Sequence, residues 1–236
     1  MNVAIIAAAG QGVRMGSKRA KQFLELDGIP VIIHTLTRFE QCPDIDEVVV
    51  VLPEEDVKGF PALAWEHGLT KASRAIAGGK TRAQSVKLGL ESFRGRYVKI
   101  VAVHDGVRPF VTAAEISATI RSARRNRAAI LVAPVTDTIK VVLGKSVKHS
   151  LRREELRRAL TPQCFDYRLL RDALENIRST ASARHITDDS MLVEGRVKVS
   201  TVAGDPRNIK ITQPEDLALA EIILKQNPEF RINSAK

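Results

Sequence analysis

The segment from Asn2 to Lys21 combines glycines and cations in a way that suits a bound phosphate chain. An apolar run typical of a buried strand is followed by Gly10 and Gly12, and the cations Arg14 and Lys21 lie in the same stretch. Glycine lets the backbone turn sharply and approach a ligand closely. Because such a turn after a strand exposes several backbone N–H groups together, the segment predicts a polyphosphate site.

Two familiar phosphate-binding motifs do not match this segment. The dinucleotide fingerprint requires a glycine where Met15 stands, and the ATPase loop G-x-x-x-x-G-K-[ST] occurs in no frame. A dinucleotide oxidoreductase is therefore disfavoured. For the glycine loop taken alone, the alternative is a surface turn with solvated charges.

A second polar cluster, VHDGVRPF at 103–110, follows an apolar run that predicts a strand over 97–103. Ligands of open α/β sheets bind at the carboxyl ends of strands, where this cluster lies. The carboxylate of Asp105 suits Mg²⁺, which prefers one or two carboxylates together with phosphate oxygens. The guanidinium of Arg108 can bind a phosphate through two N–H groups. The alternative is a structural Asp–Arg pair at a turn.

These residues need elements that bring strand ends together. Apolar runs predict strands at 3–9, 47–52, 74–77, 97–103, 128–135 and 197–203. The segments between them predict helices at 31–42, 54–68, 81–93, 112–125, 165–177 and 214–224. His34 and Trp65 are interpreted as packing residues. The alternation predicts an α/β fold, a Rossmann-like open, mostly parallel twisted sheet with helices on both faces.

One segment departs from this alternation. Residues 136–155 alternate apolar and polar side chains around Gly144 and Lys145, which predicts a projecting β-hairpin arm at about 136–156. An arm that leaves a compact domain must bury its apolar face on another surface. We expect the rest of residues 1–236 to form one domain with this arm.

Composition limits the class of protein. The chain has 236 residues, of which 44% are hydrophobic, as in ordinary globular proteins, and no apolar run is long enough to cross a membrane. Its two cysteines suggest no disulfide framework, so we expect a cytoplasmic location. The net charge of +10 attracts polyanions, and a basic nucleic-acid-binding module is one alternative. Aromatic residues make up only 4% and no nucleic-acid-binding signature occurs, so we expect no nucleic acid partner.

Several motifs together resemble a known family. The pattern AAAG-x-G-x-R-M-G…KQF-L-x-L-x-G-x-P-V-I-x-H resembles the sugar-phosphate nucleotidyltransferases. Three further signals are VHDGVRPF, APVTDTIK at 133–140 with LTPQ at 160–163, and NIKIT-x-PEDLALAE at 208–221. Together they resemble the 2-C-methyl-D-erythritol 4-phosphate cytidylyltransferases, from about Val3 to Leu224. This resemblance implies transfer of a cytidylyl group from CTP to methylerythritol phosphate with Mg²⁺, in the non-mevalonate isoprenoid pathway, by a homodimer formed through the arm.

The resemblance also implies roles for single residues. Catalytic roles fall on Arg14, Lys21, Arg153 and Lys210. Nucleotide binding falls on Ala8, Ala9, Gly10, Gly12, Gly79, Ser85 and Asp105, and Asp105 is also the expected metal ligand. Substrate binding falls on Arg108, Thr138 and Thr161. Thr138 and Arg153 are expected to complete the site of the neighbouring subunit. The chain departs from the family's usual residues at Ala20, a position usually proline, and at Lys80, often acidic.

Two further interpretations concern the acidic segment 185–189 and the identity of the acceptor. In the segment 185–189, the acidic residues are interpreted as mainly structural, and Thr187 is expected to cap the helix that follows, so no metal site is predicted there. The nearest rival function is a cytidylyltransferase acting on ribitol 5-phosphate, which shares the glycine loop and the Asp–Arg turn. The segments APVTDTIK and LTPQ favour the erythritol enzyme.

Overall fold

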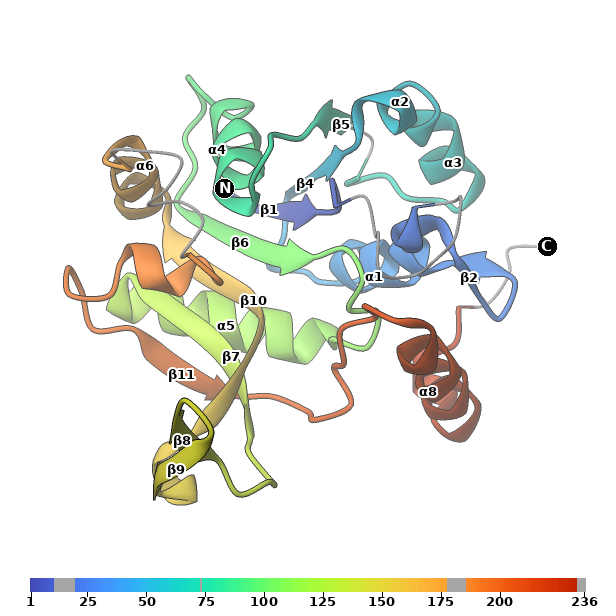
Figure 1. Ribbon diagram of the computed structural model, residues 1–236. Coiled ribbons are helices and arrows are strands. Elements are labelled where there is room, and N and C mark those ends of the chain that lie inside the picture. Colours follow the sequence, from blue (N-terminus) through green and yellow to red (C-terminus); the bar gives the residue numbers. More distant parts are fainter. Residues whose placement is uncertain (11–19, 73, 178–185, 233–236) are drawn as a thin grey trace.

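The computed structural model describes residues 1–10, 20–72, 74–177 and 186–232, and it contains a seven-stranded mixed sheet (Figure 1). Its strands are β1 (Asn2–Ala7), β4 (Glu47–Leu52), β5 (Arg74–Ala77), β6 (Ile100–Asp105), β7 (Ala128–Pro134), β10 (Arg157–Asp166) and β11 (Ser200–Ala203). Their order is β11-β7-β10-β6-β1-β4-β5. The described pairings are parallel except those of β10, which runs antiparallel to β6 and β7. The expected mostly parallel α/β fold is confirmed.

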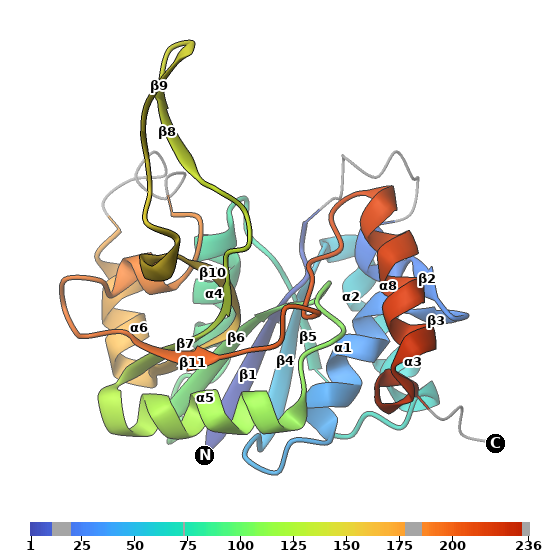
Figure 2. The same ribbon diagram turned by 90° about the horizontal axis from the view of Figure 1, so that it is seen from below.

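Helices cover both faces of the sheet because successive strand residues point to opposite sides. In β1, Ala4 and Ile6 pack with helices α1 (Val31–Glu40), α3 (Phe60–Glu66) and α5 (Ala113–Asn126). Val3 and Ile5 pack on the other face, under α4 (Arg82–Glu91) and α6 (Tyr167–Glu175). Figure 2 looks onto the face covered by α1 and α5. Because both faces are covered, the central strands β1 and β4 are apolar along most of their length, as in other buried parallel sheets.

The carboxyl-terminal part returns the chain to the sheet. After β11, residues 204–213 run along the ends of the strands into α8 (Pro214–Gln226), and the turn η5 (Pro228–Phe230) follows. The amide of Ile211 donates to the carbonyl of Val107 at 2.9 Å. Ile211 is also buried with Leu26, Phe110 and other apolar residues of a small separate cluster. These contacts hold the segment that carries Lys210 against the turn that follows β6.

The hairpin predicted around Gly144 is present as β8 (Lys140–Leu143) and β9 (Ser146–Ser150). Gly144 has a φ of +58°, which suits a tight turn. Figure 2 shows the hairpin projecting away from the sheet. Val142, Leu143 and Val147 are 61%, 76% and 61% exposed. The hairpin itself is confirmed, whereas its role as a dimer contact stays a prediction.

Three expectations are wrong, and one strand was missed. The helix expected at 54–68 is broken into α2 (Glu54–Val57) and α3, which begins just before Pro61. Trp65 does not pack in the core but is 83% exposed on α3. The strand β10 was not predicted, and β6 begins at Ile100 rather than at residue 97.

The remaining short elements complete the chain. They are η2 (Lys21–Phe23), β2 (Glu25–Leu26), β3 (Ile29–Pro30), η3 (Arg153–Glu155) and η4 (Ser190–Leu192). His34 is buried as expected and its ring Nε2 lies 2.8 Å from the carbonyl of Leu26. None of the helices in the described ranges is long and apolar enough to cross a membrane.

Candidate active site

A cleft of about 650 Å³ opens at the carboxyl ends of β1 and β6. This is the edge of the sheet where ligands of open α/β folds bind. Its described lining is Ala7, Ala8, Ala9, Gly10, Lys21, Gln22, Gly79, Lys80, Thr81, Arg82, Ser85, Asp105, Val107 and Lys210. The structure therefore brings together, from five separate segments, eight of the residues expected from the sequence.

The loop before α4 closes one side of the cleft. Gly78 approaches β1 so closely that a Cβ atom there would lie 2.3 Å from the Cβ of Ala9. The amide of Gly79 donates to the hydroxyl of Ser85 at 3.1 Å, and the hydroxyl of Thr81 caps α4 by accepting from the amide of Gln84. These bonds fix the backbone around Gly79 within the cleft.

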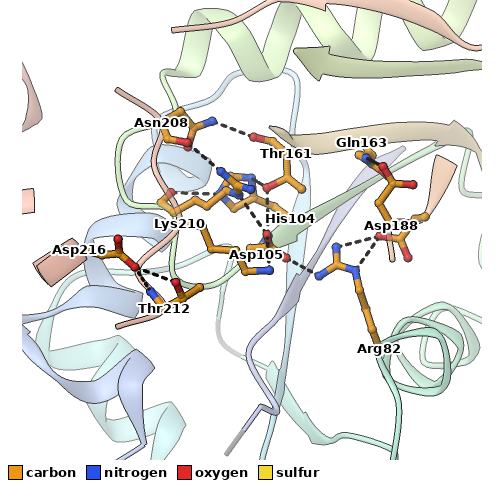
Figure 3. Close-up of polar contacts among 12 residues, drawn as sticks. Arg82, His104, Asp105, Thr161, Gln163, Asp188, Asn208, Lys210, Thr212 and Asp216 are labelled. Atoms are coloured by element: carbon orange, nitrogen blue, oxygen red, sulfur yellow. Dashed lines mark hydrogen bonds and ion pairs between the residues drawn. The ribbon is translucent and has the colours of Figure 1, made fainter. Parts of the chain in front are cut away.

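Asp105 lies at the floor of the cleft among three cations (Figure 3). Its Oδ1 accepts from Arg82, while its Oδ2 accepts from Arg108 at 3.0 Å and lies 3.1 Å from Nζ of Lys210. Burial alone would raise the pKa of Asp105, but the charges of Arg82, Lys210 and Arg108 outweigh it and hold that pKa well below its usual range. The carboxylate is therefore ionised and fixed at both oxygens.

A buried hydrogen-bonded chain lies behind Asp105. The amide of Asp105 donates to the hydroxyl of Thr161 at 3.2 Å, and that hydroxyl lies 2.9 Å from Nδ1 of His104. The other ring nitrogen lies 3.1 Å from the carbonyl of Arg108, which can only accept, so Nε2 carries the proton and Nδ1 accepts from Thr161. Burial and the nearby Arg108 and Arg82 lower the pKa of His104 to about 3, although Asp105 opposes this.

Thr161 was expected to bind substrate. In the structure it lies beside the site, but it is only 4% exposed and its hydroxyl joins Asp105 to His104. Its position next to Asp105 is thus clear, and its contact with substrate stays a prediction.

The buried side chain of Asn208 holds the segment 208–210 beside the cleft. This side chain donates to the carbonyl of Thr161 at 2.9 Å, and Arg108 donates to the carbonyl of Asn208 at 2.8 Å. Lys210 is held two residues further on, with its ammonium group on Asp105. Arg108 contacts Asp105 and supports this segment, but it is not part of the cleft lining described above.

Lys21 enters the cleft from the start of η2. Burial alone would raise the pKa of Asp216, but hydrogen bonds from Thr212 and Gln213 lower it, with a smaller contribution from the positive charge of Lys21. The carboxylate of Asp216 accepts from the amide and the hydroxyl of Thr212. Lys21 thus lies near the beginning of α8 as well as in the cleft.

Four expected site residues are not in this cluster. Thr138 and Arg153 lie on or next to the arm, where both are exposed, and Arg153 donates to the carbonyl of Thr136 at 3.0 Å. Gly12 and Arg14 lie outside the described residues. The roles of all four stay predictions.

The residues of the cleft fit a magnesium ion bound mainly by substrate phosphates. Asp105 is the one carboxylate in the described lining, and no cluster of three or more His, Cys, Asp or Glu residues that could hold a metal occurs in the described ranges. Mg²⁺ commonly takes one or two carboxylates and completes its coordination with phosphate oxygens and water. One ionised carboxylate in a cleft lined by Lys21, Lys80, Arg82 and Lys210 matches that donor set.

Sequence reasoning missed Arg82 and misplaced a cap. Arg82 follows Gly78 and Gly79 closely, and a cation just after a glycine pair was the signal that could have identified it. In the structure Asp189 directly precedes η4 and makes no side-chain cap bond, and the carboxylate of Asp188, not the hydroxyl of Thr187, accepts from the amide of Met191 at 3.2 Å. The carboxylate can accept from the backbone directly, whereas the hydroxyl of Thr187 lies 3.3 Å from the sulfur of Met191.

Comparison with known proteins shows the family of this chain. The family model described as 2-C-methyl-D-erythritol 4-phosphate cytidylyltransferase matches residues 2–226. This chain belongs to that family. A 2-C-methyl-D-erythritol 4-phosphate cytidylyltransferase of Halalkalibacterium halodurans is 41% identical over 223 residues, covering 94% of this chain and 96% of the relative. The protein of the same description from Geobacter metallireducens is 42% identical over 230 residues, covering 94% and 97%.

Solved structures agree with the family membership. The crystal structure of 4-diphosphocytidyl-2C-methyl-D-erythritol synthase from Anaerococcus prevotii is similar with a TM-score of 0.83 and 32% identity, covering 95% of this chain and 96% of that one. The family member from Thermus thermophilus has a TM-score of 0.72 and 32% identity, covering 94% and 98%. The family model's match over residues 2–226 spans the seven strands of the sheet and the described lining of the cleft.

Proposed function

We propose that this chain transfers the cytidylyl group of CTP to 2-C-methyl-D-erythritol 4-phosphate, releasing pyrophosphate and forming 4-diphosphocytidyl-2-C-methyl-D-erythritol. Membership of the cytidylyltransferase family supports the reaction. The observation that carries the proposal is the cleft that Lys21, Lys80, Arg82 and Lys210 line together with one buried carboxylate, that of Asp105. A cationic site of this kind suits two phosphorylated substrates.

The chemistry needs positioned charge rather than a protein nucleophile. The acceptor phosphate is already anionic at neutral pH, so it can attack the α-phosphorus of CTP without a general base. Lys21 would stabilise the negative charge that grows on the α-phosphate in the transition state. Lys210 would bind the acceptor phosphate, with Arg108 holding the segment that carries it. Near Gly79, backbone amide and carbonyl groups can read the edge of the cytosine ring.

Asp105 would hold Mg²⁺ together with phosphate oxygens of CTP. The ion, when bound, supplies positive charge to the triphosphate and to the leaving pyrophosphate. The protein's own contribution is a carboxylate whose pKa is kept low by three cations, so it is ionised at any pH at which the enzyme would work.

The proposal includes a homodimer. The arm exposes Val142, Leu143 and Val147 to solvent in the single chain. In a two-fold dimer, each subunit would cover this apolar patch of the other. Arg153 and Thr138 would then serve the cleft of the other subunit. Both cysteines are free and buried, which supports work in a reducing cytoplasm.

A comparison of two acceptors, assayed separately, tests the proposal. The purified protein is given CTP and Mg²⁺ with methylerythritol phosphate or with ribitol 5-phosphate, and pyrophosphate release is followed. We expect release with methylerythritol phosphate and at least about tenfold lower kcat/KM with ribitol 5-phosphate, a difference of about 1.4 kcal/mol in transition-state binding. A preference for ribitol 5-phosphate would assign the rival acceptor, and release from neither would overturn the proposal.

A further inference from the structure

Arg82 occupies a special place in the cleft because it joins three separate parts of the chain. It begins α4, directly after the loop that holds Gly79. Its guanidinium binds Asp105 at the end of β6 (Figure 3), and it also binds Asp189 in the segment that precedes η4. Its side chain is 23% exposed and lines the cleft.

The two contacts of Arg82 differ in character. Asp189 is 1% exposed, and its Oδ2 accepts from Nε of Arg82 at 3.2 Å and from Nη2 at 2.8 Å. This two-point contact fixes the plane of the guanidinium. The remaining nitrogen, Nη1, donates to Oδ1 of Asp105. Asp189 is therefore the anchor, and Asp105 is the group that the anchored arginine holds.

The contact with Asp105 is not duplicated by the other cations. Arg108 and Lys210 both meet Oδ2 of Asp105, and within the described part of the chain Arg82 is the one cation on Oδ1. Arg82 therefore determines the direction of the oxygen that the other two leave unbound. Among the described residues, the buried Oδ1 of Asp189 has no hydrogen-bond partner, so the side chain of Asp189 is held there through its contact with Arg82.

We propose that Arg82 is a positioning residue for the cytidylyl transfer, anchored by Asp189, which orients the Asp105 carboxylate toward the metal–triphosphate group and ties the nucleotide-binding loop before α4 to that carboxylate. The inference rests on the proposed function. It gives a role to Arg82, for which the sequence motifs predicted none. Arg82 acts through Asp105 and through the position of α4.

A simple truncation does not test this, because it would leave Asp189 buried and unpaired. Removing one partner of a buried ion pair is strongly destabilising, whereas neutralising both partners is tolerated far better. The decisive variant is therefore Arg82→Gln combined with Asp189→Asn. The matched control is Arg74→Gln with Glu47→Gln, which removes an ion pair with an N–O distance of 3.0 Å from the starts of β4 and β5, at the opposite ends of the strands.

The variants are compared in steady-state turnover with CTP, methylerythritol phosphate and Mg²⁺. For Arg82→Gln/Asp189→Asn we expect kcat to fall at least about thirtyfold while the KM for CTP changes less than about threefold, because an orienting interaction acts mainly in the transition state. The control double variant should keep both parameters. A wild-type kcat in folded Arg82→Gln/Asp189→Asn overturns the proposal, since Arg82 would then only neutralise Asp189.

Two further measurements keep the outcomes separate. The electron paramagnetic resonance spectrum of Mn²⁺ bound with CTP, recorded without acceptor, should change in the Arg82→Gln/Asp189→Asn protein because the carboxylate that would hold the ion loses its orientation, and a spectrum identical to that of wild type would overturn the proposal. This reading does not require turnover, so it tests Arg82 even if wild-type protein fails to use methylerythritol phosphate. If the double variant does not fold, Arg82→Lys decides. It keeps the charge but loses the two-point contact, and an unchanged turnover and Mn²⁺ spectrum in that variant would contradict the proposal.

Discussion

At the scale of single residues, the site consists of cations arranged around one carboxylate and supported by a neutral histidine. Asp105 is ionised because Arg82, Lys210 and Arg108 surround it, and His104 is neutral because it is buried between Thr161 and Arg108. An ionised and a neutral side chain thus occur in adjacent residues. Two predictions belong to this scale.

The first concerns Lys21, which lines the cleft at the start of η2. Lys21→Ala should lower kcat at least about a hundredfold, the scale of losing one preorganised charge donor, and should leave the fold intact. Lys99→Ala, an exposed lysine just before β6 at the far end of that strand, is the matched control and should keep full activity. Steady-state kinetics with circular dichroism measure both. Near-normal turnover in folded Lys21→Ala would remove Lys21 from the mechanism.

The second concerns pH. The pKa of His104 is about 3 in the folded protein against 6.5 for an ordinary histidine, so the unfolded chain binds a proton first as the pH falls. The stability that comes from keeping this ring neutral is complete above pH 6.5 and is lost progressively down to about pH 3. Between pH 6 and 4, wild type should lose about 2 kcal/mol more free energy of unfolding than His104→Gln. Urea denaturation at several pH values measures this, and equal losses would show that His104 is not the group responsible.

At the scale of elements, what could be predicted depended on whether the signal was local. Strands β4 and β5 occur as predicted because apolar runs and flanking turn residues define them. Strand β10 was missed because its first part, with Arg157 and Arg158, is exposed and polar, and only its pairing with β6 and β7 makes it a strand. Trp65 was assigned to the core from its residue type, but the break before α3 leaves it facing solvent.

Prediction of the site residues also depended on whether the sequence signal was local. The residues of the glycine loop, Gly79, Asp105 and Lys210 were found because they stand in short motifs at strand ends, and the cleft contains those that the structure describes. Arg82 was missed because its importance comes from contacts with Asp105 and Asp189, which are distant in the sequence. The structural role of Thr161 likewise depends on His104, 57 residues away.

The close approach of the loop before α4 to the segment after β1 gives a prediction at this scale. A Cβ at Gly78 would meet the Cβ of Ala9 at 2.3 Å, and Val51 is also close. Gly78→Ala should therefore lower the free energy of unfolding by about 1–3 kcal/mol, the usual cost of overpacking, and should widen the cleft wall. Gly59→Ala is the control, because a Cβ there meets nothing within 4 Å. Thermal denaturation compares the two, and equal stability would contradict the close approach of these segments.

At the scale of the whole molecule, the arm is the feature that a single chain does not explain. Apolar side chains at Val142, Leu143 and Val147 are left in water, each forgoing roughly 1.5–3 kcal/mol of burial. A symmetric dimer would bury this patch twice and would bring Arg153 to the second cleft. The dimeric assembly and the completeness of each active site would then depend on the same contact of the arm.

Mixing two inactive variants tests this arrangement. If Arg153→Ala and Lys21→Ala subunits exchange freely, half of the dimers are mixed, and each mixed dimer holds one site with both lesions and one site with neither. Activity should return toward roughly a quarter of wild type. The control is each variant incubated alone, with exchange confirmed by mass spectrometry of differently labelled subunits. A mixture that stays inactive after exchange would show that Arg153 acts within its own chain, or not at all.

The central claim is that the acceptor phosphate attacks the α-phosphorus of CTP in the cleft above Asp105. It is tested most directly by methylerythritol phosphate whose phosphate oxygens carry ¹⁸O, with the products followed by ³¹P NMR. We predict that labelled oxygen forms the bridge between the two phosphorus atoms of the cytidine diphosphate ester, and that the released pyrophosphate carries no label. Label in a pyrophosphate product, or formation of CMP or CDP without the coupled ester, would contradict the claim.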